Sequence, residues 1–416
     1  MNFIKKNNIF NYKASSLEKF YFCILIFFII SSFFITIPTD IDDIGISSTN
    51  LAIGDRSFYI NNSLKGYGYS NFSGNILYPT VLKIITSICN LFGADEYSKL
   101  WNTITIFITS LLSLITLRLL RASSYLIFNE KVSKISCLIY ILNPYTYFYS
   151  LSGGITNYVV VGVSFAMYLI CYLYKRGSLI TNKDNLISNI FINISCIYLS
   201  LLRPSGGIFG TIFLIIFLCK YIRIYIDKRS FNIIRFANIF ITVFGLIIVT
   251  YNIKTVLNYS FAHVNIFLNE KGYYFGYSRE LLRSKLKFDS INILENLKMA
   301  LYYLSWKITD FVSGISDIRD SHDAQNINNL LPFIFRTSTG IFFLFPINLF
   351  SFLGILLNIR LIIKTELWIV LISSFIAISP SLLGVAMSRY LIMFFPPFIL
   401  FAAKIINDTL QGADIS

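Results

Sequence analysis

The side chains best suited to chemistry are four aspartates that follow the first apolar run of the sequence. Asp55 lies in the segment Gly54–Tyr59, and Asp40, Asp42 and Asp43 form a tighter cluster before it. A carboxylate shielded from water can act as a general base, because burial and nearby charges shift its pKa. Asp55 is equally well placed as a helix N-cap, where aspartate is favoured. The three-aspartate cluster could hold a divalent cation through its oxygens or form a solvated loop.

Two arginines at the ends of apolar runs are candidate phosphate ligands. Arg203 begins the break Arg203–Gly207, where inserting an unpaired cation into a membrane costs about 2.5–3.5 kcal/mol. A guanidinium binds a phosphate through two parallel hydrogen bonds. An interhelical ion pair is the alternative, but the predicted spans contain almost no carboxylates. Arg389, followed by Tyr390, has the same character, with anchoring at the membrane interface as an equal alternative.

Other chemistry-bearing side chains are sparse. His322 lies near three aspartates, a pattern that favours a solvated loop over a metal site. The aromatic segment Tyr273–Tyr277 could stack on a sugar ring or form part of an interfacial aromatic belt. The sequence has no Walker loop, dinucleotide fingerprint, nucleophile elbow or HExxH motif, and so no evident site for a soluble nucleotide-sugar. No cofactor is expected. The sequence leaves open whether the protein uses a divalent cation.

The composition decides the class of protein that must position these residues. The 416 residues are 55% hydrophobic and 13% charged, with a mean hydropathy of +0.66. Repeated apolar runs approach the roughly 20 residues that cross a bilayer. These features predict one all-α polytopic membrane domain over residues 1–416. The net charge of +14 lies largely in short loops, which is typical of membrane orientation and argues against nucleic-acid binding.

Apolar runs and their flanking charges predict ten spans. They cover residues 20–37, 100–117, 135–149, 157–173, 190–202, 207–219, 236–251, 339–359, 366–384 and 391–403. The first run follows several lysines, but no small-residue cleavage site comes after it and further spans do, so it is predicted to be an uncleaved helix. The runs 190–202 and 207–219 are either two spans or one element broken at Arg203.

The loop charges predict the orientation of the chain. Every short connection assigned to the cytoplasm is basic, and the opposing short connections hold few cations apart from Arg203 and Arg389. Both termini then lie in the cytoplasm, and two long segments, 38–99 and 252–338, lie outside. Within the first of these, residues 79–93 have an apolar helical face and are predicted to lie in the membrane interface. The two halves of the chain differ in their loop lengths and in the placement of broken helices, which argues against a transporter built from inverted repeats.

Five short motifs in this order resemble the GT-C class of integral-membrane glycosyltransferases. They are Gly54–Tyr59, the Gly66–Ser70 repeat of glycine and tyrosine with Tyr78-Pro79, Asn143-Pro144 leading to Tyr149-Ser150, Leu201–Gly206, and Ser388–Tyr390. The resemblance covers the chain to about residue 220 in order, and the last span more loosely. Within that class the chain is most similar to serotype-converting glucosyltransferases that decorate O-antigen.

The resemblance implies roles for particular residues. Asp55 matches the catalytic base of the first outer loop, while Arg203 and Arg389 match the basic residues that hold the donor phosphate. Tyr59 and Tyr390 join them as substrate-binding candidates. Many relatives have an acidic residue at the start of the fourth span, where this chain has Thr156-Asn157-Tyr158. A second carboxylate role is therefore not carried over.

The implied reaction is transfer of one sugar, glucose by resemblance, from undecaprenyl-phosphate sugar to O-antigen or another lipid-linked glycan. It would be an inverting displacement on the periplasmic face of the bacterial inner membrane, amid membrane lipid. An O-antigen polymerase or ligase is the nearest alternative. A polysaccharide flippase is a third reading, but it would need polar residues along the middle of several spans.

Overall fold

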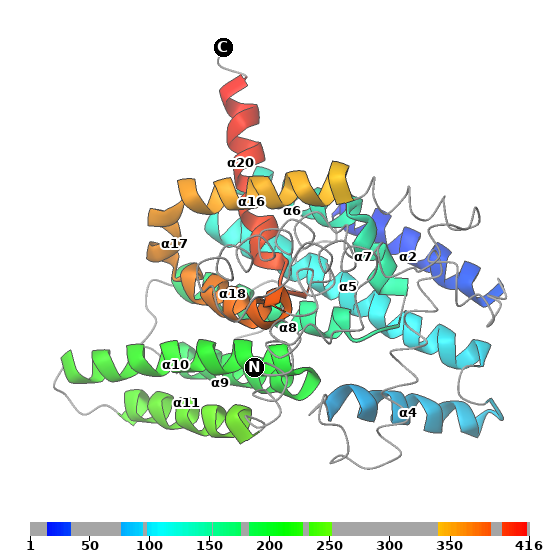
Figure 1. Ribbon diagram of the computed structural model, residues 1–416, viewed down its shortest axis with the longest axis horizontal. Helices are drawn as coiled ribbons and strands as arrows, with labels where there is room; N and C mark the ends of the chain where they lie inside the picture. The colour runs from blue at the N-terminus through cyan, green and yellow to red at the C-terminus, as the bar shows by residue number, and fades with distance from the viewer. Residues whose placement is uncertain are drawn as a thin grey trace, which may run out of the picture.

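The computed structural model describes residues 15–34, 76–94, 98–151, 153–175, 183–227, 233–251, 340–383 and 393–413 (Figure 1). Every regular element within these ranges is helical, so the predicted all-α class is confirmed. The helices are α2 (Ser16–Phe34), α4 (Leu77–Leu91), α5 (Lys99–Ile127), α6 (Glu130–Leu142), α7 (Pro144–Leu151), α8 (Thr156–Lys175), α9 (Lys183–Leu202), α10 (Pro204–Asp227), α11 (Ile233–Tyr251), the π-helical turn η3 (Gly340–Leu344), α16 (Phe345–Leu357), α17 (Ile359–Thr365), α18 (Leu367–Leu383) and α20 (Pro396–Ala413).

Four of these helices are long and apolar enough to cross a membrane: α5, α8, α11 and the Pro204–Arg223 part of α10. A fifth candidate is the bent pair Phe342–Leu357 and Ile359–Thr365, whose two parts meet at 76°. Shorter apolar helices lie beside them, as expected for runs below about 20 residues. The chain is therefore a helical membrane protein with several spans.

The expected span 135–149 is wrong as a single helix. Helix α6 ends at Leu142, Asn143 is extended with φ −71° and ψ 110°, and α7 begins at Pro144. Proline disfavours the α conformation of the residue before it and provides no backbone N–H. The last helix also differs from the expected 391–403, because α20 begins at Pro396 and continues to Ala413.

Helix α8 occupies the centre of the bundle. It is buried along almost its whole length and packs against α5, α9, α18 and α20. Gly162 permits the closest approach to α9, since a Cβ there would lie 2.7 Å from the Leu199 side chain, and Ser195 Oγ donates to the Gly162 carbonyl at 3.0 Å. Helices α9, α10 and α11 run along one another, and each of the three packs against the other two (Figure 1). These three helices and α8 position the connection that carries Arg203.

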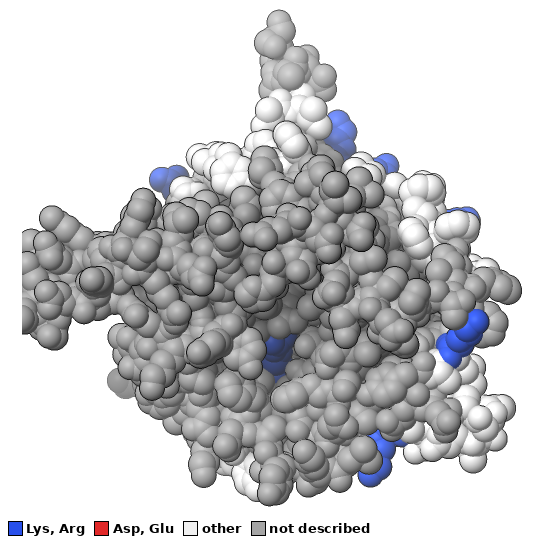
Figure 2. Space-filling model, turned by 45° about the vertical axis from the view of Figure 1, so that its right-hand side comes forward, with Lys and Arg blue, Asp and Glu red and all other residues white. Residues whose placement is uncertain are grey.

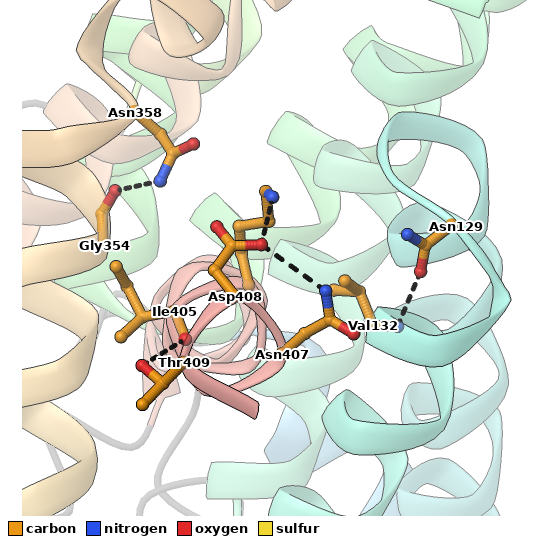
Figure 3. A network of polar contacts seen from close by, with 9 residues as sticks. Asn129, Val132, Gly354, Asn358, Ile405, Asn407, Asp408 and Thr409 are labelled. Carbon is orange, nitrogen blue, oxygen red and sulfur yellow. Dashed lines mark hydrogen bonds and ion pairs between the residues drawn. The ribbon is translucent and has the colours of Figure 1, made fainter. Parts of the chain in front are cut away.

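Contacts between distant helix ends fall into two groups, which we call the inner edge and the outer edge. The inner edge holds the ion pairs Glu18–Arg121 and Lys220–Glu366, which join ends assigned to the cytoplasm. Figure 3 shows a further meeting there, where the C-terminal half of α20 lies between the end of α16 and the start of α6. The outer edge holds Arg203 and the start of α4. This grouping is what the predicted sidedness requires, while the cytoplasmic assignment itself stays a prediction.

Candidate functional site

Arg203 lies in the turn between α9 and α10, half-buried at the outer edge. Its backbone N–H donates to the Leu199 carbonyl at 3.2 Å, and its carbonyl accepts from the Gly207 N–H at 3.0 Å. The two predicted spans around this residue are therefore two separate helices, packed along each other rather than joined as one broken element. Arg203 stands at the turn of this hairpin.

Small residues make the hairpin tight enough to aim the arginine. A Cβ at Gly206 would lie 2.2 Å from the Leu199 carbonyl oxygen, and one at Gly210 would lie 3.0 Å from the Cys196 carbonyl oxygen. Pro204 begins α10, at the helical position where its missing N–H costs nothing. The sequence after Arg203 thus brings the two backbones into contact and leaves the guanidinium at the turn.

The guanidinium contacts the segment that leads into the last helix. Arg203 Nη1 donates to the Met393 sulfur at 3.4 Å, and the rings of Phe209 and Phe394 stack with centroids 5.9 Å apart. Arg389 lies four residues before Met393, a stretch of chain that spans at most about 14 Å. The fold thus brings Arg203 to Met393, which follows the Ser388–Tyr390 motif in the sequence.

Most other predicted site residues lie outside the described residues. This holds for the proposed base Asp55, for the secondary candidates Asp40, Asp42 and Asp43, and for Tyr59, Arg389 and Tyr390. The same applies to His263, His322 and the Tyr273–Tyr277 segment. The separation of Asp55 from Arg203 therefore stays a prediction.

Of the predicted motifs in the first outer loop, Tyr78-Pro79 lies within the described residues, near the start of α4. The Tyr78 hydroxyl donates to the Gly153 carbonyl at 2.8 Å, and its ring packs edge-on against Tyr158 with centroids 5.3 Å apart. Helix α4 confirms the helix expected over residues 79–93, with Leu82, Ile85 and Cys89 on its buried face. The start of α4 is thereby fixed to the start of α8 and to the residues just before it.

Asn157, at the start of α8, belongs to a buried polar group. Its amide nitrogen donates to the Thr109 carbonyl at 3.1 Å and to Ser150 Oγ at 3.2 Å, while Thr109 Oγ1 donates to the Ser150 carbonyl at 2.6 Å. These bonds tie α5, α7 and α8 together next to the Asn143–Pro144 break. Sequence reasoning missed Thr109, although hydroxyl side chains recur at helical spacing along α5.

The described residues contain no group of three or more His, Cys, Asp or Glu side chains arranged to hold a metal. On the face drawn in Figure 2, basic surface shows in separate patches, with no acidic side chain of the described ranges beside it. All six cysteines are free thiols. The charge that the described part offers to a ligand on this face is therefore positive.

Comparison with known proteins gives a distant structural likeness. No protein-family model and no curated protein matches the sequence. The crystal structure of the Archaeoglobus fulgidus oligosaccharyltransferase in the apo form is similar with a TM-score of 0.45 and 13% identity, over 94% of this chain and 51% of that one. Its complex with Zn and sulfate gives a TM-score of 0.44 and 12% identity, over 92% and 49%. The chain spans about half the length of the proteins that it matches.

Proposed function

We propose that this protein is a glycosyltransferase that moves a single sugar from a polyprenyl-phosphate donor to a glycan at the outer face of the membrane. The observation that carries the proposal is the position of Arg203. It stands at the hairpin turn of α9 and α10, with its guanidinium against Met393, four residues from Arg389. Two arginines from distant parts of the chain can thereby serve one phosphate, the group that guanidinium side chains bind best.

In the proposed reaction Asp55 accepts the proton of an acceptor hydroxyl as that oxygen attacks the anomeric carbon. The bond from the anomeric carbon to the phosphate oxygen breaks, and Arg203, aided by Arg389, stabilises the departing polyprenyl phosphate. This combines general-base catalysis with electrostatic stabilisation of the leaving group. Tyr59 and Tyr390 are proposed to contact the substrate. One displacement inverts the anomeric configuration.

The finer proposal is a hexosyltransferase that adds glucose from undecaprenyl-phosphate glucose to O-antigen in the bacterial inner membrane. It is supported by the motif order from Gly54–Tyr59 to Ser388–Tyr390. Mass and linkage analysis of the surface polysaccharide, with and without the protein, identifies the sugar and the acceptor. An unchanged lipopolysaccharide ladder with an altered sugar content is expected. A loss of chain length would instead show a polymerase.

The catalytic assignment is tested by Asp55→Asn, which keeps the side-chain shape but removes the base. We expect sugar transfer to be abolished in isolated membranes supplied with the polyprenyl-phosphate sugar, while the protein level and membrane insertion stay unchanged. Asp43→Asn is the matched control, because it makes the same change in the same outer segment. Wild-type transfer by Asp55→Asn would contradict the proposal. Loss in Asp43→Asn alone would move the role to the aspartate cluster.

A further inference from the structure

Helix α17 forms an elbow between α16 and α18 at the inner edge of the bundle. It meets α16 at an angle of 76°, and Figure 1 shows it running across from the end of α16 to the start of α18. Both of these neighbours are apolar helices that run through the bundle. A helix that turns by this angle at the end of a membrane-crossing helix lies along the membrane surface. The elbow is at the opposite edge from Arg203, so it is separate from the proposed transfer site.

The elbow is held at both of its ends. Before it, the Asn358 side-chain amide donates to the Gly354 carbonyl at 2.9 Å, and the Asn358 carbonyl accepts from the Ile362 N–H at 2.9 Å. After it, Glu366 has a left-handed backbone with φ 62° and forms an ion pair with Lys220 of α10. Between these ends the Ile362 side chain is buried in the core. The rotation of α17 about its own axis is therefore fixed.

With its inward face buried, α17 presents an apolar pair and a basic pair to its surroundings. Ile359 and Ile363 are 53% and 63% exposed, and Arg360 and Lys364, the residues that follow them, are exposed as well. Residues four apart lie on the same side of a helix, so the two pairs form adjoining strips. An apolar strip beside a basic strip is typical of a helix that lies in a membrane interface.

The basic strip lacks a counter-charge within the described part of the chain. No described carboxylate pairs with Arg360 or Lys364, and Glu366, the nearest acidic residue along the sequence, is engaged by Lys220. Like charges four residues apart destabilise a helix, and the β-carbons of such a pair lie about 5–6 Å apart. Both side chains can therefore reach the oxygens of one phosphate, and a phosphate bound there relieves their repulsion.

We propose that the elbow binds the head group of an anionic phospholipid in the leaflet at the inner edge, with its phosphate between Arg360 and Lys364. The acyl chains lie against Ile359 and Ile363, and this adjoining apolar strip favours a lipid over a soluble anion. Basic groups beside membrane-crossing helices are attracted to anionic lipids. The bound lipid holds the connection between α16 and α18 at one depth in the membrane. The site stands whether or not the protein transfers sugar.

Native mass spectrometry of the purified full-length protein tests the site with two lipids that share the same acyl chains. Phosphatidylglycerol is expected to bind at least about fivefold more tightly than phosphatidylcholine, because one cation near an anionic head group contributes about that factor. Phosphatidylcholine has the same phosphate, but its own quaternary ammonium offsets the charge. Equal binding of the two lipids, or preference for phosphatidylcholine, would overturn the proposal.

Variants locate the binding. Arg360→Gln and Lys364→Gln are each expected to weaken phosphatidylglycerol binding about fivefold and to leave phosphatidylcholine binding unchanged. Lys131→Gln is the matched control, because it removes an exposed cation from the start of α6, at the same edge of the bundle but away from the elbow. If neither elbow variant differs from Lys131→Gln, the preference belongs to the basic edge as a whole and the elbow is not the site.

Two further arms sharpen the result. Lys364→Glu places a carboxylate four residues from Arg360, so the preference for phosphatidylglycerol should be lost without a lower melting temperature. A retained preference would overturn the proposal, and if this variant does not fold, Lys364→Gln still decides the outcome. Soluble glycerol 3-phosphate is expected to bind far more weakly than phosphatidylglycerol, because it buries no acyl chains. Equal affinity for the two would overturn the lipid source in favour of a soluble phosphate.

Discussion

The two edges of the bundle use their cations differently. At the inner edge Arg121, Lys220 and Lys404 each bind a carboxylate, and two of these pairs join different helices. At the outer edge Arg203 donates to the Met393 thioether, and the turn around it is held by glycine contacts. An ion pair with a carboxylate fixes the helix ends that it joins, whereas a bond to a thioether holds the Arg203 guanidinium against the approach to the last helix. This contrast agrees with the proposal that the inner edge serves stability and that Arg203 at the outer edge binds a phosphate.

The largest effect is expected at Arg203. Removing a group that stabilises developing charge typically lowers turnover about 10²–10³-fold, so Arg203→Gln should lose transfer to that extent without unfolding the protein. Arg203→Lys keeps the charge but loses the two-point geometry, so its transfer should be impaired but measurable. Transfer is measured in isolated membranes, with protein level as the control. An unchanged rate in Arg203→Lys would assign the residue a structural role.

Gly206→Ala tests how far the outer edge depends on close backbone contact. Its Cβ would lie 2.2 Å from the Leu199 carbonyl oxygen, so α9 and α10 must separate, at a cost of about 3 kcal/mol for overpacking. A lower melting temperature in detergent and a loss of transfer are expected. Ser205→Ala is the neighbouring control, since Ser205 Oγ is buried without a hydrogen-bond partner among the described residues, and its removal should be neutral or stabilising. Equal destabilisation by both variants would refute the role given to the glycine.

Lys220→Met breaks an inner-edge ion pair and should reduce stability without directly affecting transfer. It leaves Glu366 partly buried and uncompensated, with only 19% of its side chain exposed, so we expect a loss of about 2 kcal/mol. Adding Glu366→Gln should restore part of the stability, as a double-mutant cycle of melting curves would show. If the double variant is no more stable than the single one, the pair does not couple α10 to the α17–α18 turn.

Lys404→Gln should have the smallest effect. Its bond to Asp408 at 2.5 Å is an exposed i,i+4 pair on α20 (Figure 3), a type worth about 0.3–0.5 kcal/mol. The melting temperature of the variant should be only slightly below that of the wild type. The difference should be smaller still at high salt, because salt screens exposed pairs. A loss as large as that of Lys220→Met would show that this end of α20 carries more of the inner edge than its exposure suggests.

Much of the fold could be predicted from local sequence. Apolar runs identify most helices, and the amphipathic pattern of residues 79–93 identifies α4. The Asn143–Pro144 break follows from a rule readable in the sequence, yet the apolar run across it obscured the helix end. Of the candidate site, Arg203 could be singled out because a cation between apolar runs is costly wherever it lies.

Contacts across long sequence separations could not be predicted in this way. Arg203 and Met393 are 190 residues apart, and Arg121 and Glu18 are 103 apart. No local pattern in the sequence encodes which helices become neighbours, because many packings satisfy the same apolar faces. The polar group of Thr109, Ser150 and Asn157 likewise exists only once α5, α7 and α8 meet.

The sequence by itself determined the class of protein, the approximate helices, their expected sidedness and the identity of the residues able to handle a phosphate. These follow from hydrophobicity, charge and proline, which act locally along the chain. Only the tertiary structure decided that the chain reverses at Arg203 rather than passing through it. It also decided that this arginine meets the approach to the last helix and that Arg121 and Lys220 at the inner edge are paired. The reason is physical: these properties depend on which surfaces pack together, and glycine contacts and partly buried ion pairs settle that choice in three dimensions.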